Sequence, residues 1–320
     1  MTAIPDSLER YGEEPLQQAP AFGPGKDGVF EATLVRDPGG ETRLLRDYAK
    51  VPYHLTGTLD SDPAPGLTTL CLQEPTGGVA QGDRHRIDVD ACDRARAHVT
   101  TQSATKVHSM RANYAHLDAT LSAGPEAHLE YLPGPTIVNE DARCLQTTTV
   151  SLHETATVVV ADVLVPDGLS AHEPFGFDHY HSRLEARCND RLVCVDTVDL
   201  RPGERDPRDA ATVGEYGVVA TLYVFAPWEA ADRLADGIAD RLTEAAPGRA
   251  ASADRVLDSD DRRAVLEGVQ TGVSVLPYES GVSVRVLGHR CVDVTAAVTA
   301  AWDEARSHLL GVGAPADRRY

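Results

Sequence analysis

The sequence predicts a mainly β protein, and two observations support this fold class. Some fourteen short apolar stretches with period-two alternation follow one another from Gly28 onward, separated by turn-forming residues. No helical stretch alternates with these strand-like stretches, whereas a βαβ protein would show such alternation. Amphipathic helical patterns occur only late, over residues 228–246 and near residues 295–310. We therefore expect one β domain over residues 28–320, with two α-helices in its C-terminal half.

Residues 1–27 contain four prolines and three glycines and have little hydrophobic periodicity. We expect them to form a flexible leader. The basic-then-apolar order of a secretion signal is absent from residues 1–10, and no stretch approaches about 18 uninterrupted apolar residues. The expected localisation is therefore cytoplasmic, with no membrane partner.

The first two strands are expected to form a hairpin, because residues 29–36 and 42–48 flank Asp37-Pro38-Gly39-Gly40. Twelve further stretches have the composition and length of strands. They are residues 67–73, 85–89, 97–101, 115–121, 127–132, 145–153, 157–165, 179–187, 192–200, 218–225, 273–276 and 282–287.

The first helix is predicted from Leu234, Ile238 and Leu242, which recur at every fourth position, while charged residues occupy the opposite face. Pro247 and Gly248 end this pattern. The second helix has one apolar face that ends before a glycine. Its members are Val298, Trp302, Ala305 and Leu309, followed by Gly311.

The chain carries 49 acidic and 30 basic side chains, a formal net charge of -19. This charge repels phosphate backbones, and no cluster of basic residues compensates locally, so nucleic acid is not an expected partner. Only Lys26, Lys50 and Lys106 are lysines, and the acids are spread along the chain. We interpret this pattern as adaptation to a salt-rich cytoplasm, the alternative being an ordinary acidic protein.

Six widely spaced cysteines include no CxxC pair, which excludes a zinc ribbon. We expect them to be reduced and to serve mostly as small core residues. They are Cys71, Cys92, Cys144, Cys188, Cys194 and Cys291.

Metal-ligating side chains are most concentrated at residues 172–181. On a strand, His179 and His181 project from the same face, with Cα atoms about 6.5 to 7 Å apart. Imidazole and carboxylate groups suit nickel or zinc, so His172, His179 and His181 are candidates for weak, transient metal binding. With Glu173 they are also the candidate centre of a metal-dependent hydrolase. The alternative interpretation is a set of solvated strand histidines.

Two other segments are rich in glycine or in hydroxyl groups, but neither predicts an enzyme class. The Gly-rich segment 73–83 lacks the Lys-Ser/Thr ending of a phosphate-binding loop, so we interpret it as a tight turn with positive φ at its glycines. The segment 100–106 combines hydroxyl groups with Lys106, but Ser103 has no nucleophile-elbow motif around it. Ordinary strand threonines explain this second segment.

Five segments in order resemble one family, the urease accessory protein UreD (also called UreH). The segments are Pro75-Thr76-Gly77-Gly78 with Gly82-Asp83, Thr100-Thr101-Gln102-Ser103-Ala104-Thr105-Lys106, Leu129-Glu130-Tyr131-Leu132-Pro133-Gly134-Pro135, Glu173-Pro174-Phe175, and Ser182-Arg183-Leu184-Glu185. The resemblance extends from about residue 28 to residue 311.

The resemblance implies a non-enzymatic role. Proteins of this family are scaffolds that bind apo-urease, recruit UreF and, through it, the GTPase UreG, and help to deliver nickel to the urease active site through a polar internal path. No tightly bound cofactor is implied, only transient Ni²⁺. The implied fold is an elongated, β-helix-like stack of short strands with two helices, which agrees with the pattern above.

The resemblance also implies candidate site residues. The candidates for lining a nickel path, or for holding its walls, are Glu130, Glu173, Asp83, Thr101, Ser103 and Lys106. Residues of the shared motifs that we expect to serve structure are Gly77, Gly78, Gly82, Arg183 and Glu185, the last two as an ion pair. In the alternative of a purely structural adaptor, the candidate carboxylates have no part in nickel delivery.

Overall fold

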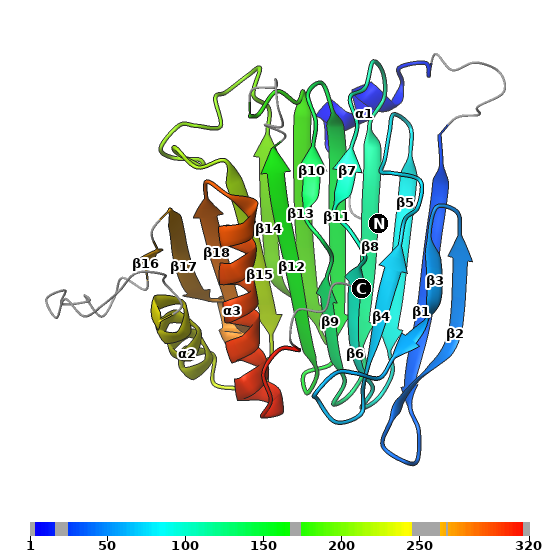
Figure 1. Ribbon diagram of the computed structural model, residues 1–320, viewed down its shortest axis with the longest axis vertical. Coiled ribbons are helices and arrows are strands. Elements are labelled where there is room, and N and C mark those ends of the chain that lie inside the picture. The colour runs from blue at the N-terminus through cyan, green and yellow to red at the C-terminus, as the bar shows by residue number, and fades with distance from the viewer. Residues whose placement is uncertain (1–3, 17–24, 167–173, 245–262, 267, 316–320) are drawn as a thin grey trace, which may run out of the picture.

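Successive long strands of the central region alternate between two facing β-sheets, as Figure 1 shows for the computed structural model of the chain. The structure describes residues 4–16, 25–166, 174–244, 263–266 and 268–315. Each circuit of the chain from β4 to β13 contributes one long strand to each sheet. This arrangement is a β-solenoid-like stack, so the predicted mainly β fold is confirmed.

The first sheet has seven strands, and its four central strands, with β1, run parallel to one another. In spatial order its strands are β14 (Arg191–Leu200), β13 (His179–Cys188), β11 (Arg143–Leu152), β8 (Ala115–Ala123), β5 (Arg84–Ala91), β1 (Asp27–Arg36) and β2 (Thr42–Lys50).

The second sheet has eleven strands, of which β4, β6, β9 and β12 are parallel neighbours. In spatial order its main strands are β16 (Arg263–Leu266), β17 (Val269–Val275), β18 (Gly281–Gly288), β15 (Val218–Phe225), β12 (Thr157–Pro166), β9 (His128–Leu132), β6 (Arg96–Thr101), β4 (Leu67–Gln73) and β3 (His54–Leu59). The short strands β10 (Thr136–Val138) and β7 (Thr105–Val107) extend it beside β12.

Strand alternation explains the core between the sheets. In each strand, alternate residues such as Phe30, Leu70, Leu121, Leu129 and Val158 project inward and are completely or almost completely buried. Parallel strands normally need helical crossovers, but here each crossover is itself a strand of the opposite sheet. The absence of βαβ alternation in the sequence is therefore compatible with a largely parallel fold.

The two predicted C-terminal helices are present with shifted boundaries. They are α2 (Ala231–Glu244) and α3 (Cys291–Leu310), which lie side by side on the outer face of the second sheet near β15, β17 and β18 (Figure 1). Gly311 ends α3 in the left-handed conformation, with φ of 73°, and its N–H donates to the carbonyl of Ser307. A short 3₁₀ helix, Pro277–Glu279, precedes β18.

Residues 6–12, within the expected leader, form a helix. A short helix, α1 (Asp6–Gly12), packs through Leu8 against Tyr114 and Leu145, on the outer face of the first sheet. The predicted hairpin is confirmed, since β1 and β2 pair antiparallel and Gly40 adopts φ of 89° at the turn. Across the described part of the chain, no helix has both the length and the apolar character needed to cross a bilayer.

Candidate functional site

A cavity of about 330 Å³ lies between the two sheets. Apolar side chains share its wall with hydroxyl, amide and charged groups. The polar residues of the wall include Glu74, Thr101, Ser103, Thr105, Lys106, Thr136, Gln146 and Thr148. Five predicted residues therefore meet at this cavity, because Gly77 and Gly78 line it together with Thr101, Ser103 and Lys106.

The Gly-rich segment is held against β7 at one wall of this cavity. Gly78 has φ of 120°, and a Cβ added there would lie 2.3 Å from the carbonyl oxygen of Lys106. The N–H of Val79 donates to the same carbonyl at 2.8 Å. Only glycine fits this close approach at positive φ, so the predicted positive-φ turn is confirmed.

Asp83 is not part of the cavity lining. Its buried carboxylate accepts hydrogen bonds from the backbone N–H groups of Lys26, at 2.7 Å, and Ala80, at 2.8 Å. The ammonium group of Lys26 lies 3.2 Å from Asp83 and donates to the carbonyl of Gly78. Asp83 therefore closes the loop that carries Gly77, Gly78 and Gly82, and the loop borders the cavity.

Glu74 and His85 form a buried polar pair that the sequence analysis missed. Oε1 of Glu74 lies 3.8 Å from Nδ1 of His85, and neither atom makes a hydrogen bond within the described part of the chain. Burial raises the pKa of Glu74. Burial also lowers the pKa of His85 to about 4, so this imidazole is neutral near pH 7. The sequence gives no signal for the pair, since the two residues meet across the sheets.

A second, smaller cavity of about 30 Å³ adjoins the first. Both are lined by Tyr131, Gln146 and Thr148, so they share part of their walls. Asp162 lines the smaller cavity and accepts a hydrogen bond from the hydroxyl of Ser182 at 3.0 Å. Burial raises the pKa of Asp162, although its hydrogen bonds and the charge of a nearby arginine oppose the shift.

Asp196 also lines the smaller cavity and is partly exposed to solvent. Its side chain is 25% exposed and lies 2.5 Å from a guanidinium nitrogen of Arg285. The hydroxyl of Tyr223 also donates to Asp196. Asp162 and Asp196 were not predicted, because a single strand aspartate does not show from sequence which cavity it will line.

Glu130 lies outside both cavity linings. It projects from β9 on the side opposite Leu129 and Tyr131, toward α3. Its two oxygens lie 2.9 Å from His128, 3.1 Å from His98 and 3.2 Å from Arg306. Burial by itself raises the pKa of Glu130, but the hydrogen bonds with the two histidines outweigh burial and hold the pKa well below its usual range.

Arg183 and Glu185 lie two residues apart on β13. A guanidinium nitrogen of Arg183 lies 3.4 Å from Glu185, and Arg187 lies 2.8 Å from the other oxygen of the same carboxylate. These contacts form the ion pair that we expected for Arg183 and Glu185. His172 and Glu173 lie outside the described residues, so their predicted roles stay predictions.

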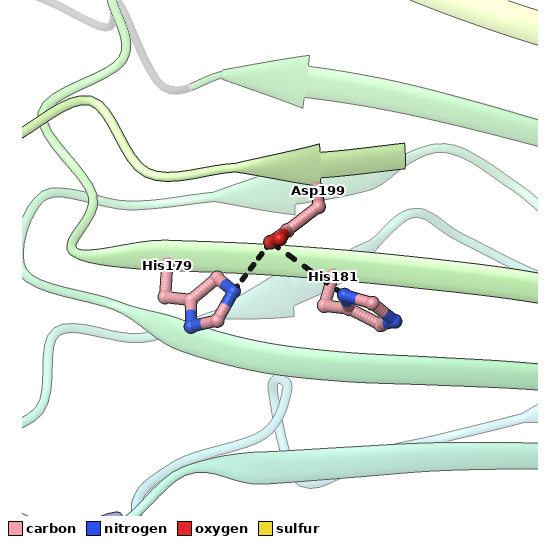
Figure 2. A group of neighbouring side chains, drawn as sticks. All are labelled: His179, His181 and Asp199. Carbon is pink, nitrogen blue, oxygen red and sulfur yellow. Dashed lines mark hydrogen bonds and ion pairs between the residues drawn. The ribbon is translucent and has the colours of Figure 1, made fainter. Parts of the chain in front are cut away.

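The two strand histidines lie beside a carboxylate, as Figure 2 shows. Nε2 of His179 lies 2.7 Å from Oδ1 of Asp199, and Nδ1 of His181 lies 3.5 Å from the same oxygen. Burial lowers the pKa of both histidines, while Asp199 opposes that shift. Hydrogen bonds from Arg201 and His179 outweigh the effect of burial on Asp199 and lower its pKa to about 2. Both histidines are buried, so the interpretation of solvated strand histidines is wrong.

The fold and the cavities define a class of protein, a β-solenoid-like body with partly polar cavities between its sheets. Residues 26–319 match the family model of the UreD urease accessory protein. The chain therefore belongs to the UreD urease accessory protein family, and the resemblance found in its motifs is confirmed.

Curated relatives cover nearly the same length. The chain is 69% identical to a urease accessory protein UreD of Natronomonas pharaonis over 100% of both chains. It is 54% identical to a UreD of Haloquadratum walsbyi, over 98% of this chain and 95% of the relative. It is 30% identical to urease accessory protein UreD 2 of Brucella suis, over 96% of each.

Proposed function

We propose that this protein is a scaffold that binds apo-urease and, with UreF and the GTPase UreG, delivers nickel to the urease active site. Membership in a family of urease accessory proteins supports a role in urease maturation. The proposed partners, UreF and UreG, and the proposed delivery of nickel go beyond this general role. They rest on the resemblance of the motifs together with the two cavities described above.

The observation that carries the nickel path is the pair of adjoining polar cavities. The proposed path enters beside Glu74 and Lys106, passes Gln146 and Thr148, and continues to Asp162 and Asp196. Thr101 and Ser103 form part of its wall. The path places carboxylates at its start, middle and end, with neutral oxygen donors between them.

The cavity volumes indicate where the ion would lose water. Six waters at about 30 Å³ each occupy roughly 180 Å³, so a hydrated divalent ion fits within the 330 Å³ cavity. The adjoining cavity of about 30 Å³ has room for about one water. An ion that enters it exchanges most of its water shell for protein oxygens, and the carboxyl groups of Asp162 and Asp196 both line this cavity.

The donor set suits passage more than storage. Oxygen donors bind nickel less strongly than imidazole or thiolate groups do, and the carboxylates are few along the path. Conduction requires binding that is favourable enough for entry and weak enough for exit. The protein is accordingly proposed to hold Ni²⁺ transiently and to have no tightly bound cofactor.

The protein is proposed not to be an enzyme. The alternative, a metal-dependent hydrolase, needs His172, Glu173, His179 and His181 to form one centre beside a substrate cavity. His179 and His181 lie on the outer face of the first sheet, and neither lines the two cavities described above. Hydrolysis by the isolated, metal-loaded protein would favour the alternative.

The proposed setting is a salt-rich cytoplasm. The net charge of -19 and the scarcity of lysine support it, as do relatives of 69% and 54% identity from halophilic archaea. Molar salt shortens the Debye length to about 3 Å, which screens repulsion between dispersed surface carboxylates. Salt also screens the attraction of Ni²⁺ to surface carboxylates, so the few carboxylates in the interior are the ones that attract the ion.

The proposed function is tested by deleting the gene for this protein in its own cells. We expect urease to accumulate with little bound nickel and little activity, and reintroducing the gene should restore both. Nickel per urease is measured by mass spectrometry of the purified enzyme. Unchanged nickel content and activity in the deletion strain would contradict the proposal.

A further inference from the structure

The outer face of the first sheet carries a second group of metal-ligating side chains. Tyr180 projects into the interior, where its hydroxyl donates to Gln146. His179 and His181, the residues on either side of it, therefore project to the opposite face. Asp199 on β14 pairs in register with His181, so strand pairing holds these three side chains together.

The geometry of this group resembles that of a cation site. The ligand atoms of His179, His181 and Asp199 all lie within 4.8 Å of one another. The side chains of His179 and His181 are 0% and 9% exposed. Nδ1 of His181 is buried, has no hydrogen-bond partner within the described residues, and is directed at Oδ1 of Asp199 (Figure 2).

The nearby positive charges leave one oxygen of Asp199 directed at the histidines. A guanidinium nitrogen of Arg201 lies 2.7 Å from Oδ2, whereas both imidazoles are directed at Oδ1. The Nε atom of Arg201 is 3.4 Å from Oδ1, a weaker contact that a cation would displace. Arg201 thus orients the carboxylate and leaves Oδ1 as a donor.

Helix α1 covers one side of the group. The ring of Tyr11 packs edge-on against the ring of His179, with centroids 6.1 Å apart. The same ring lies 4.2 Å from the guanidinium of Arg143, and Arg143 forms a 2.6 Å ion pair with Glu14. A cation here would lie at the edge of α1 and be partly shielded from water.

We propose that His179, His181 and Asp199 form a binding site for a divalent cation of the nickel and zinc class, separate from the interior path. Two imidazoles and one carboxylate suit these borderline ions, and water would complete the coordination. The proposal does not depend on the interior path, because the site lies on the outer face of the first sheet.

The site is tested with the untagged, full-length protein and Ni²⁺ or Zn²⁺ in equilibrium dialysis. Asp199→Asn and His181→Ala should each weaken binding at one site at least tenfold, whereas His54→Ala, which changes an exposed histidine on β3, should bind as the wild type does. Identical stoichiometry and affinity in wild type and both site variants would overturn the proposal.

X-ray absorption at the nickel edge keeps the proposal testable if a variant misfolds. The wild-type protein with one equivalent of Ni²⁺ should show scattering from two imidazole ligands, and its absence would overturn the site. The outcome is distinguishable from that of the proposed function, because dialysis and absorption report binding alone, whereas the deletion experiment reports nickel in urease.

Discussion

At the residue scale, Glu130 shows what strand alternation can and cannot predict. Leu129 and Tyr131 contribute to the core between the sheets, so Glu130 projects to the other face of β9. Because α3 covers that face, Glu130 is buried as completely as its neighbours. A strand that is covered on both faces gives no sequence signal for which face is the interior.

Glu130 is part of a buried ionic network that fixes α3 to the second sheet. Arg306 donates to Glu130 at 3.2 Å and to Asp62 at 3.0 Å, and His98 stacks on Trp302 with ring centroids 5.1 Å apart. Removing one charge from such a network leaves its partners uncompensated.

We expect Glu130→Gln to lower the free energy of unfolding by about 3 kcal/mol. The reason is that Arg306 and the two histidines lose their shared anion in a buried position. Chemical denaturation measures the change, with Glu215→Gln, at an exposed position, as the control. A change in stability no larger than that of the control would contradict the buried-network description.

His85 predicts a specific dependence of stability on pH. Its pKa is about 4 in the folded protein and 6.5 in an unfolded chain, so the unfolded state binds the proton first. The stability associated with neutral His85 is therefore present above pH 6.5 and is lost as the pH falls toward 4. A shift of this size corresponds to roughly 3 kcal/mol.

The measurement is the free energy of unfolding between pH 4 and pH 7 for wild type and His85→Phe. We expect the variant to lose less stability across this window, since its side chain takes up no proton. His54→Ala, an exposed histidine variant, should retain the wild-type slope. Equal slopes for wild type and His85→Phe would show that His85 is not held neutral by burial.

At the scale of elements, α1 shows why a short helix within residues 1–27 was missed. A seven-residue helix is too short to be stable alone, so its sequence carries little periodic signal. Its contacts are distant in sequence, since Glu14 and Tyr11 both meet Arg143. Only the folded sheet brings these residues together.

We expect Arg143→Ala to release α1 from the first sheet. Loss of the charged hydrogen bond with Glu14 and of the contact with Tyr11 should raise amide exchange in α1 by roughly 10- to 100-fold. Hydrogen exchange with mass spectrometry measures the effect, and Arg205→Ala, which removes an exposed pair with Asp209, is the control. Unchanged exchange in α1 would mean that other contacts hold the helix.

At the scale of the whole molecule, the sequence predicted the fold better than the site. Strand periodicity and the two late helices identified a β body, and the ordered motifs pointed to its family. The cavity brings together Gly77, Thr101 and Lys106 from the predicted motifs. It also uses Glu74 and Gln146, which no motif distinguished, because strands distant in sequence build its wall.

Once the fold is known, the net charge of -19 implies less about nickel binding than the sequence alone would suggest. Of the many carboxylates, only Glu74, Asp162 and Asp196 are assigned here to the proposed nickel path. Asp83 and Glu130 are buried in structural contacts, and most of the other acids are explained by solvation of the surface. The proposed nickel path is therefore local, because it depends on the three interior carboxylates of Glu74, Asp162 and Asp196.

The most direct test measures nickel per urease in cells in which this protein carries Asp162→Asn. The substitution retains the shape of Asp162 and one acceptor oxygen, but it replaces the second oxygen with an amide donor and removes the ability to ionise inside the smaller cavity. Asp209→Asn, in an exposed loop, is the matched control. We predict that Asp162→Asn leaves the complex with urease intact and lowers its nickel content severalfold, and wild-type nickel content would contradict the proposed path.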